Sequence, residues 1–211
     1  MNNKDLFIKW LGHSCFVVGY DNIKVMFDPY RPKSVPGLND EINIGVNHVF
    51  ISHNHDDHNF DRVPCFLNLV PLDYQTIEVA HDEENGQLRG MNLIHIVYLN
   101  GYKVVHMGDI GCDLNDEQVE KLKDADLLLI PINGFYTIGS EKAYHIAKLI
   151  NAKLMIPMHY YYDGMGYPDD HQLDKLLNLA SNVIKTSKTE FNLKDYINNN
   201  ENKVLVLDYH H

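Results

Sequence analysis

Four side chains that commonly bind metal ions fall within the segment 53–58, which has the sequence His-Asn-His-Asp-Asp-His. Imidazole nitrogens and carboxylate oxygens are the ligands that zinc and its neighbouring divalent ions prefer. Side chains alternate along an extended strand end, so we expect His53 and His55 to face the same side and to hold one metal ion. Asp57 and His58 follow an expected bend and can reach a second ion. A histidine-rich surface loop is the alternative, but four ligand-type residues directly after an apolar run favour a metal site.

One cluster cannot complete two sites, because a catalytic zinc ion takes about three protein ligands besides water. His81, Asp109 and His159 are further candidates, since each comes soon after an apolar run, where clefts tend to form. His95 and His106 compete with His81 as the third ligand of the first ion. His95 lies within an expected strand and is therefore predicted to be a core histidine. For His106 we favour a structural role, orienting a ligand through a hydrogen bond.

The elements that must position these residues are short strands in the first half of the chain and alternating strands and helices in the second. Strands are expected over 6–11, 15–20, 24–27, 48–52, 66–70, 76–79, 93–99, 102–105, 127–130, 153–157 and 203–207. Helices are expected over 115–123, 140–150 and 169–179, the first with a capping box and the second capped by Ser140. Asn100-Gly101 predicts a tight hairpin. The order predicts one α/β domain, residues 1–211, with helices outside its sheets.

The pattern His-x-His-x-Asp-His resembles the signature of the metallo-β-lactamase superfamily. Other segments, in the order expected, resemble a bacterial branch of it, the metal-dependent hydrolases similar to ascorbate-phosphate lactonase. These segments are Trp10–Phe16, Asp28-Pro29, His106–Gly111, Pro131–Gly134 with Thr137, and Pro157–Tyr160. The resemblance implies a four-layer αββα sandwich with its site at one edge between the two sheets.

The resemblance also implies a role for each matching residue. The first ion would be held by His53, His55 and His81, the second by Asp57, His58 and His159, and Asp109 would bridge both. The implied cofactors are two divalent ions, zinc first and manganese second, sharing a hydroxide that attacks a carbonyl or phosphoryl centre. Asp57 would also accept a hydrogen bond that aims this nucleophile. Asn133 stands where the family often has glycine, and Asn59 and Phe60 replace small residues. These departures concern the pocket wall rather than the metal ligands, so they leave the substrate open and not the metal chemistry.

Three further residues are candidates for the pocket. His13 could donate to the substrate or support a ligand, and a buried structural histidine is an equal alternative. Thr137 and Tyr136 are expected to face the substrate, although Tyr136 could equally serve packing. The run Tyr160-Tyr161-Tyr162 is expected to contribute at least one ring to the core.

The composition of the chain disfavours some classes of binding partner. The formal net charge is −11, which disfavours nucleic acid and is compatible with a small anionic substrate at a positive metal centre. No apolar run is long enough for a signal peptide or a membrane span, so no membrane partner is expected. Three cysteines without a Cys-x-x-Cys pair favour reduced thiols and a cytoplasmic location.

Three rival functions remain beside hydrolysis of a small anionic ester, lactone or phosphodiester. A nuclease of the same superfamily is disfavoured by the acidic balance and the absence of a basic stripe. A di-iron oxidoreductase on the same fold typically has glutamate where this chain has His55. A metal-binding protein without turnover is the third rival, although two ions with open positions are typical of catalysis.

Overall fold

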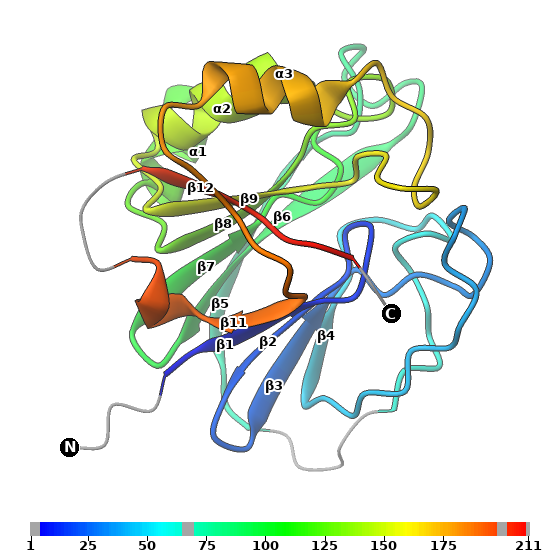
Figure 1. Cartoon of the computed structure of the whole chain (residues 1–211), viewed down its shortest axis with the longest axis vertical. Coiled ribbons are helices and arrows are strands. Elements are labelled where there is room, and N and C mark those ends of the chain that lie inside the picture. Colours follow the sequence, from blue (N-terminus) through cyan, green and yellow to red (C-terminus); the bar gives the residue numbers. More distant parts are fainter. Residues whose placement is uncertain (1–4, 65–69, 198–201, 210–211) are drawn as a thin grey trace.

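Two β-sheets stacked face to face form the centre of the computed structural model, which describes residues 5–64, 70–197 and 202–209 (Figure 1). The five-stranded sheet has the order β11-β1-β2-β3-β4. Its strands are β1 (Phe7–Trp10), β2 (Phe16–Tyr20), β3 (Ile23–Phe27), β4 (His48–Phe50) and β11 (Glu190–Asn192). Only the β3–β4 pair is parallel among these neighbours.

The second sheet has seven strands in the order β10-β12-β9-β8-β7-β6-β5. Its strands are β5 (Asp73–Ala80), β6 (Met91–Leu99), β7 (Tyr102–His106), β8 (Leu127–Pro131), β9 (Leu154–Met158), β10 (Val183–Lys185) and β12 (Lys203–Val206). Every residue of β8 and β9 is buried, because the other sheet covers one face and helices cover the other. Asn100 and Gly101 both have positive φ at the β6–β7 hairpin, as the sequence predicts.

Three α-helices lie over the outer face of the seven-stranded sheet (Figure 1). They are α1 (Asp116–Leu122), α2 (Ser140–Leu149) and α3 (Gln172–Leu179), and a 3₁₀ turn, η1 (Leu193–Asp195), follows β11. The α/β sandwich is thereby confirmed. In the described part of the chain, the outer side of the five-stranded sheet carries no α-helix, so the helical cover is one-sided there. None of the helices formed by the described residues has the length and apolarity to cross a bilayer.

Several element boundaries differ from those that the sequence predicts. Ser140 is the first residue of α2 rather than its cap, and its hydroxyl donates to the backbone of Gln172. The third helix begins at Gln172, because the Asp169 carboxylate accepts the Gln172 N–H from outside the helix. Strands β10 and β11 are additional. The strand expected over 66–70 lies almost wholly outside the described residues.

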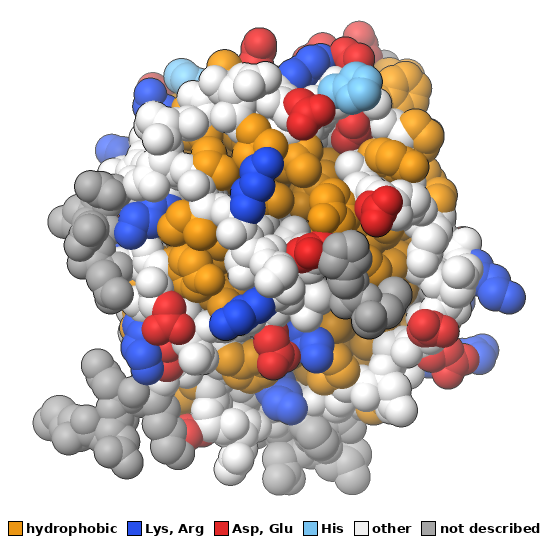
Figure 2. Space-filling model, in the orientation of Figure 1, with side chains coloured by type: hydrophobic (Ala, Val, Ile, Leu, Met, Phe, Trp, Pro, Cys, Tyr) orange, Lys and Arg blue, Asp and Glu red, His pale blue; other side chains and the backbone are white. Residues whose placement is uncertain are grey.

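Acidic and basic side chains are interspersed over the face of the molecule in Figure 2, and neither sign forms a continuous stripe there. On this face, therefore, the acidic excess of the chain, a net −11, does not gather into one patch. An extended basic track of the kind that follows a phosphate backbone is not seen on it.

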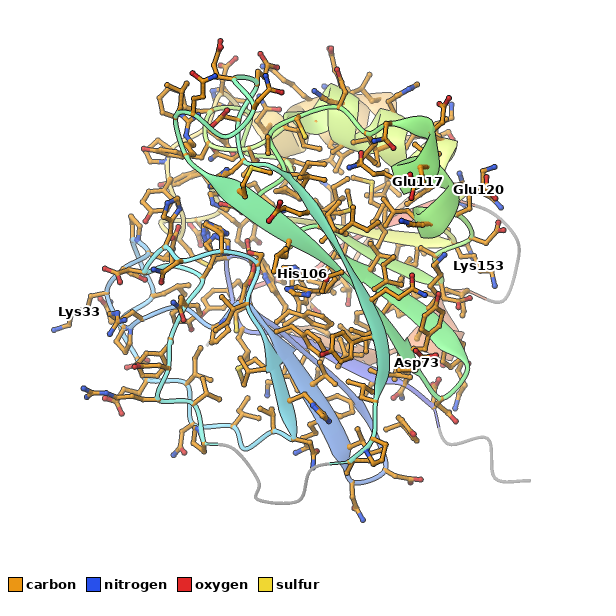
Figure 3. The ribbon with its side chains drawn as sticks, turned by 180° about the vertical axis from the view of Figure 1, so that it is seen from behind. Lys33, Asp73, His106, Glu117, Glu120 and Lys153 are labelled. Atoms are coloured by element: carbon orange, nitrogen blue, oxygen red, sulfur yellow. The ribbon has the colours of Figure 1, made fainter. Side chains whose placement is uncertain are left out.

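Aromatic rings from both sheets meet in the core, which is otherwise mostly aliphatic. Phe27 of β3 stacks on Phe50 of β4 with ring centroids 5.6 Å apart. The His106 ring of β7 crosses from the opposite sheet and lies parallel to Phe27 at 5.0 Å. Figure 3 shows His106 in this interior position between the sheets. Trp10 packs on Tyr160 at 5.9 Å, which makes Tyr160 the core member of the tyrosine run.

The candidate metal ligands lie in loops that follow strands running in the same direction. In the seven-stranded sheet β7, β8 and β9 are parallel, and β5 runs with them because two antiparallel pairings separate it from β7. In the other sheet β1, β3 and β4 share a direction by the same reasoning. Loops that follow these strands therefore emerge at a common edge of each sheet, and there they meet.

Candidate metal centre

Asp109, three residues past β7, lies at the centre of a histidine cluster. Its Oδ2 atom is 3.1 Å from Nε2 of His159 and 3.2 Å from Nε2 of His58. The same oxygen is 3.5 Å from Nε2 of His81 and 3.9 Å from Nε2 of His53. These four histidines follow β4, β5 and β9, so segments from both sheets converge on one carboxylate.

The side chains form three overlapping groups whose possible ligand atoms all lie within 4.8 Å of one another. One group is His53, His55 and His81, another is His53, His58 and Asp109, and the third is His13, Asp57, His58 and His159. The structure thus brings together all seven ligands that the resemblance implies. It adds His13 to the group that contains Asp57.

Unsatisfied atoms in this cluster fit a bound cation. Nε2 of His53, Nε2 of His58 and Oδ1 of Asp109 are buried and have no hydrogen-bond partner of suitable geometry. Buried polar atoms without partners are costly, so a folded chain normally satisfies them. Nitrogen and carboxylate donors converging at this spacing are the donor set that divalent zinc or manganese takes.

The buried Asp28 carboxylate determines which histidine nitrogens face the centre. It accepts hydrogen bonds from the Ser52 backbone N–H at 2.7 Å, the Ser52 hydroxyl at 2.6 Å and Nδ1 of His58 at 2.8 Å. Because that hydroxyl donates to Asp28, it accepts from Nδ1 of His53, 2.9 Å away. With their protons on Nδ1, both histidines direct Nε2 toward Asp109.

Electrostatics keep the carboxylates of the cluster ionised. Burial alone would raise the pKa of Asp109, but His159 and His58 hold it well below its ordinary value. Burial likewise opposes ionisation of Asp57, and the hydrogen bond from His13 together with His58 lowers its pKa. Burial, reinforced by His58, lowers the pKa of His53 to about 3. Charged carboxylates and a neutral His53 are the forms that bind cations.

His13 lies behind the site rather than in its opening. Its side chain is fully buried, and its Nε2 is 3.2 Å from Oδ2 of Asp57. Its ring packs against that of His159 with centroids 3.9 Å apart. Burial and the neighbouring His159 lower the pKa of His13 to about 4, against the opposing influence of Asp57. This placement favours support of Asp57 over contact with substrate.

Thr137 is not brought to the metal cluster. It lines a neighbouring hollow, and its hydroxyl accepts from the Asn133 N–H and donates to the Ile138 carbonyl. The asparagine at position 133, where the family pattern often has glycine, has a structural role. Its side chain accepts the N–H groups of Phe135 and Tyr136 and so closes the loop after β8. The structure therefore does not place Thr137 among the candidate metal ligands, where its predicted catalytic role would require it, and Asn133 closes this loop instead of opening the pocket wall.

His95 and His106, the alternatives to His81 as a metal ligand, form hydrogen bonds with backbone groups. His95 Nε2 is 3.0 Å from the Ile51 carbonyl, consistent with a core histidine. His106 Nε2 donates to the Ser14 carbonyl at 2.9 Å, and its Nδ1 accepts the Gly108 N–H at 3.2 Å. His106 is therefore structural, as predicted, but the predicted hydrogen bond to a ligand is wrong, because its partners are the backbone groups of Ser14 and Gly108.

A cleft of about 320 Å³ opens over the cluster, large enough for a small molecule. Its lining includes His55, Asp57, Asp109 and, on the walls, Arg89, Tyr136 and Tyr167. The Tyr167 hydroxyl donates to the Ser34 carbonyl, and burial with the nearby Asp57 raises its pKa to about 12. Sequence reasoning misses Arg89 and Tyr167, because neither follows an apolar run nor belongs to a motif.

Comparison with known proteins agrees with this geometry. The profile of the β-lactamase superfamily domain matches residues 7–64 and 67–159 of the chain. The chain belongs to this superfamily. A metal-dependent hydrolase of Methanocaldococcus jannaschii is 30% identical over 185 residues, which cover 72% of this chain and 83% of the relative. The protein therefore belongs, within the β-lactamase superfamily, to a family of metal-dependent hydrolases.

Two further proteins are similar to most of the chain. A metal-dependent hydrolase of Natranaerobius thermophilus is 23% identical over 205 residues, covering 83% of this chain and 92% of that one. A crystal structure from Thermotoga maritima, named as a zinc-dependent hydrolase of the metallo-β-lactamase superfamily, has a TM-score of 0.76 at 26% identity. The match covers 96% of this chain and 100% of the other. The narrower likeness to ascorbate-phosphate lactonase stays a prediction.

Proposed function

We propose that this metal-dependent hydrolase acts on a small anionic ester, lactone or phosphodiester bound in the cleft over Asp109. One observation carries the proposal. A single ionised carboxylate oxygen has four imidazole Nε2 atoms within 4.0 Å at the floor of that cleft. Buried donors gathered in this way beneath an opening suit ions that keep positions free for water and substrate.

Zinc is the first choice of metal and manganese the second. His53, His55 and His81 would hold one ion, Asp57, His58 and His159 would hold another, and Asp109 lies between the two groups. Bound ions would supply Lewis acidity and lower the pKa of water toward neutrality. Because Asp28 and Ser52 orient their rings, His53 and His58 direct Nε2 toward Asp109 and would bind an ion without turning.

The chain's own groups orient the reactants. The Asp57 carboxylate is ionised, is fixed by His13 and lines the cleft, so it can accept a hydrogen bond from the attacking water. Tyr136 and Tyr167, whose rings are 5.3 Å apart, form one wall and restrict water on that side. The small size of the cleft and the acidic balance of the chain support a small-molecule substrate over nucleic acid.

The odd cysteine count, with Cys15 and Cys112 as free thiols, supports a cytoplasmic location.

The test joins metal analysis to turnover. Metal content is measured by plasma mass spectrometry, and hydrolysis is followed over a panel of phosphodiesters and lactones before and after chelation. We expect roughly two ions per chain and activity that chelation abolishes. His55→Ala and Asp57→Ala should each lose at least about a hundredfold in kcat/KM, whereas His145→Ala, at an exposed position of α2, should not. If His55→Ala and Asp57→Ala lose metal but keep full turnover, hydrolysis does not occur at this site.

A further inference from the structure

Arg89 lies at the border between the cleft over Asp109 and a second hollow of about 320 Å³ beside it. It lines both, as Tyr136 does. The side chain is half-buried, in contrast to the exposed Leu88 before it. A cation therefore stands at the wall of the reaction cleft, in a protein whose net charge is −11.

The Arg89 guanidinium packs against two aromatic rings, and these contacts do not use its N–H groups. Its central carbon lies 5.7 Å from the ring centroids of both Phe135 and Tyr136. Such contacts stabilise the cation through its flat faces and leave the N–H groups at its edge available to bind an oxyanion. Among the described residues no carboxylate pairs with Arg89, whereas Arg31 pairs with Asp56 at 3.1 Å.

The backbone that carries Arg89 is fixed to the metal cluster. The buried Asp82 carboxylate accepts backbone N–H groups from four residues of the loop 84–89, including those of Leu88 at 3.0 Å and Arg89 at 2.7 Å. Asp82 directly follows His81, so one tightly bonded loop connects a candidate metal ligand to Arg89. A cation positioned in advance loses little freedom when it binds an anion.

The other charged side chains nearby leave Arg89 as the cation that an anionic ligand would contact. Lys142 also lines the second hollow, but its Nζ is 2.7 Å from the Asp113 carboxylate. Glu83 and Glu84 line the same hollow and add negative charge there. Among the described residues that line the cleft, the acidic ones are Asp57 and Asp109, which belong to the candidate metal centre.

We propose that Arg89 binds a second anionic group of the substrate, a carboxylate or a phosphate that is not itself cleaved. It thereby makes the enzyme selective for substrates that carry such a group beside the reacting bond. This inference rests on the proposed function, because it takes the cleft over Asp109 as the place of reaction. The apolar rim of Phe135 and Tyr136 accommodates the part of the substrate that joins the two groups.

The first test uses sets of p-nitrophenyl esters or phosphodiesters that differ only in a terminal group. In the charged members this group is a carboxylate or a phosphate, and in the neutral members it is a hydroxyl. In metal-loaded protein, Arg89→Gln should lower kcat/KM for the charged members about 10- to 100-fold, mainly through KM, because a charge-assisted hydrogen bond is lost. The neutral members should change less than about twofold. Arg89→Lys should recover part of the loss, and Arg62→Gln, at an exposed arginine outside the cleft, is the matched control. An equal loss on charged and neutral members would overturn the inference.

A second test needs no turnover. Inorganic phosphate and, separately, acetate are titrated into chelator-treated protein by calorimetry, which shows which anion Arg89 prefers. We expect millimolar binding of at least one anion to wild type and Arg62→Gln, weakened about tenfold or more in Arg89→Gln. Unchanged anion binding in Arg89→Gln would contradict the inference even if metal binding and hydrolysis are confirmed. A protein that binds no metal and hydrolyses nothing would instead refute the proposed function, and this titration would still report on Arg89.

Discussion

Asp28 is the residue on which the orientation of the candidate metal centre depends. Its carboxylate fixes His58 directly and His53 through the Ser52 hydroxyl. Asp28, His13 and His159 all have positive φ, a conformation that non-glycine residues rarely adopt. Strain of this kind concentrates at functional sites, because the surrounding structure must hold side chains where function needs them.

Replacing Asp28 by asparagine should weaken metal binding about 10- to 100-fold without emptying the site. The amide cannot serve as a charged acceptor for both Ser52 and His58, so the Nε2 orientation of the two histidines is lost. Competition with a chromophoric chelator measures the affinity. Asp126→Asn is the control, because Asp126 is a buried carboxylate that contacts Lys103 and Lys153 away from the cluster. Equal metal affinities in wild type and Asp28→Asn would remove this role.

His106 should make the protein less stable in acid. Its neutral form satisfies both ring nitrogens, through the Ser14 carbonyl and the Gly108 N–H, and burial lowers its pKa from 6.5 to about 4 against the influence of Asp28. Between pH 6.5 and about 4 the unfolded chain therefore binds up to one proton more than the folded chain at this residue. Its contribution to stability is complete above pH 6.5 and is lost as the pH falls toward 4, by about 1.4 kcal/mol per pH unit.

His106→Gln should consequently reduce the slope of unfolding free energy against pH between 6.5 and 4 by about one proton. Urea unfolding of chelator-treated protein at a series of pH values measures the slope. His145→Gln makes the same change at an exposed position of α2 and serves as the control. The idea is wrong if the slope of His106→Gln equals that of wild type.

At the level of elements, the site depends on how closely strand ends approach one another. Gly111 lies two residues after Asp109 in the loop that follows β7, and its N–H donates to the carbonyl of Ala80, the last residue of β5. A Cβ atom at Gly111 would lie 2.5 Å from the carbonyl oxygen of His81 and would also meet the backbone of Asp82. Only glycine lets these two loops run side by side, and this contact places His81 next to Asp109.

Gly111→Ala should therefore separate His81 from Asp109 and lower metal affinity more than tenfold. Gly101→Ala is the matched control, since Gly101 has positive φ in the β6–β7 hairpin with open space around it. It should cost stability, of the order of 1 kcal/mol, without changing metal affinity. Metal titration and thermal unfolding of both variants separate the two effects. Loss of stability without loss of affinity in Gly111→Ala would contradict the expected role.

The sequence predicts these elements best where burial is complete. Strands β8 and β9 are buried on both faces, so they appear as apolar runs whose ends mark where Asn133 and His159 emerge. Strands β10 and β11 are three residues long and partly exposed at sheet edges, and their residues carry no clear alternation. The ligand cluster at 53–58 is contiguous and was predictable, whereas Arg89 reaches the cleft only through the loop that Asp82 organises.

Across the whole molecule, the metal cluster connects the two sheets. The segment 53–58 extends from β4 of the five-stranded sheet, whereas His81, Asp109 and His159 extend from strands of the seven-stranded sheet. The apolar core joins the sheets by packing alone. At the cluster, atoms from both sheets, Nε2 of His53 and Oδ1 of Asp109 among them, are buried without hydrogen-bond partners, which fits a cation shared between the two sheets.

Removal of the metal should therefore destabilise the whole fold. Ligand present at about a thousand times its dissociation constant stabilises the folded state by about 4 kcal/mol, which in a chain of this size raises Tm on the order of 10 °C. Calorimetric scans with zinc, with manganese and after chelation should show this shift, which should grow with metal concentration. His53→Ala, which removes a ligand shared by two of the groups, should show a much smaller shift. Hydrogen exchange after chelation should rise first in the loops after β4, β5, β7 and β9, because the lost bonds lie there. An unchanged Tm after chelation would mean that packing alone holds the two sheets together.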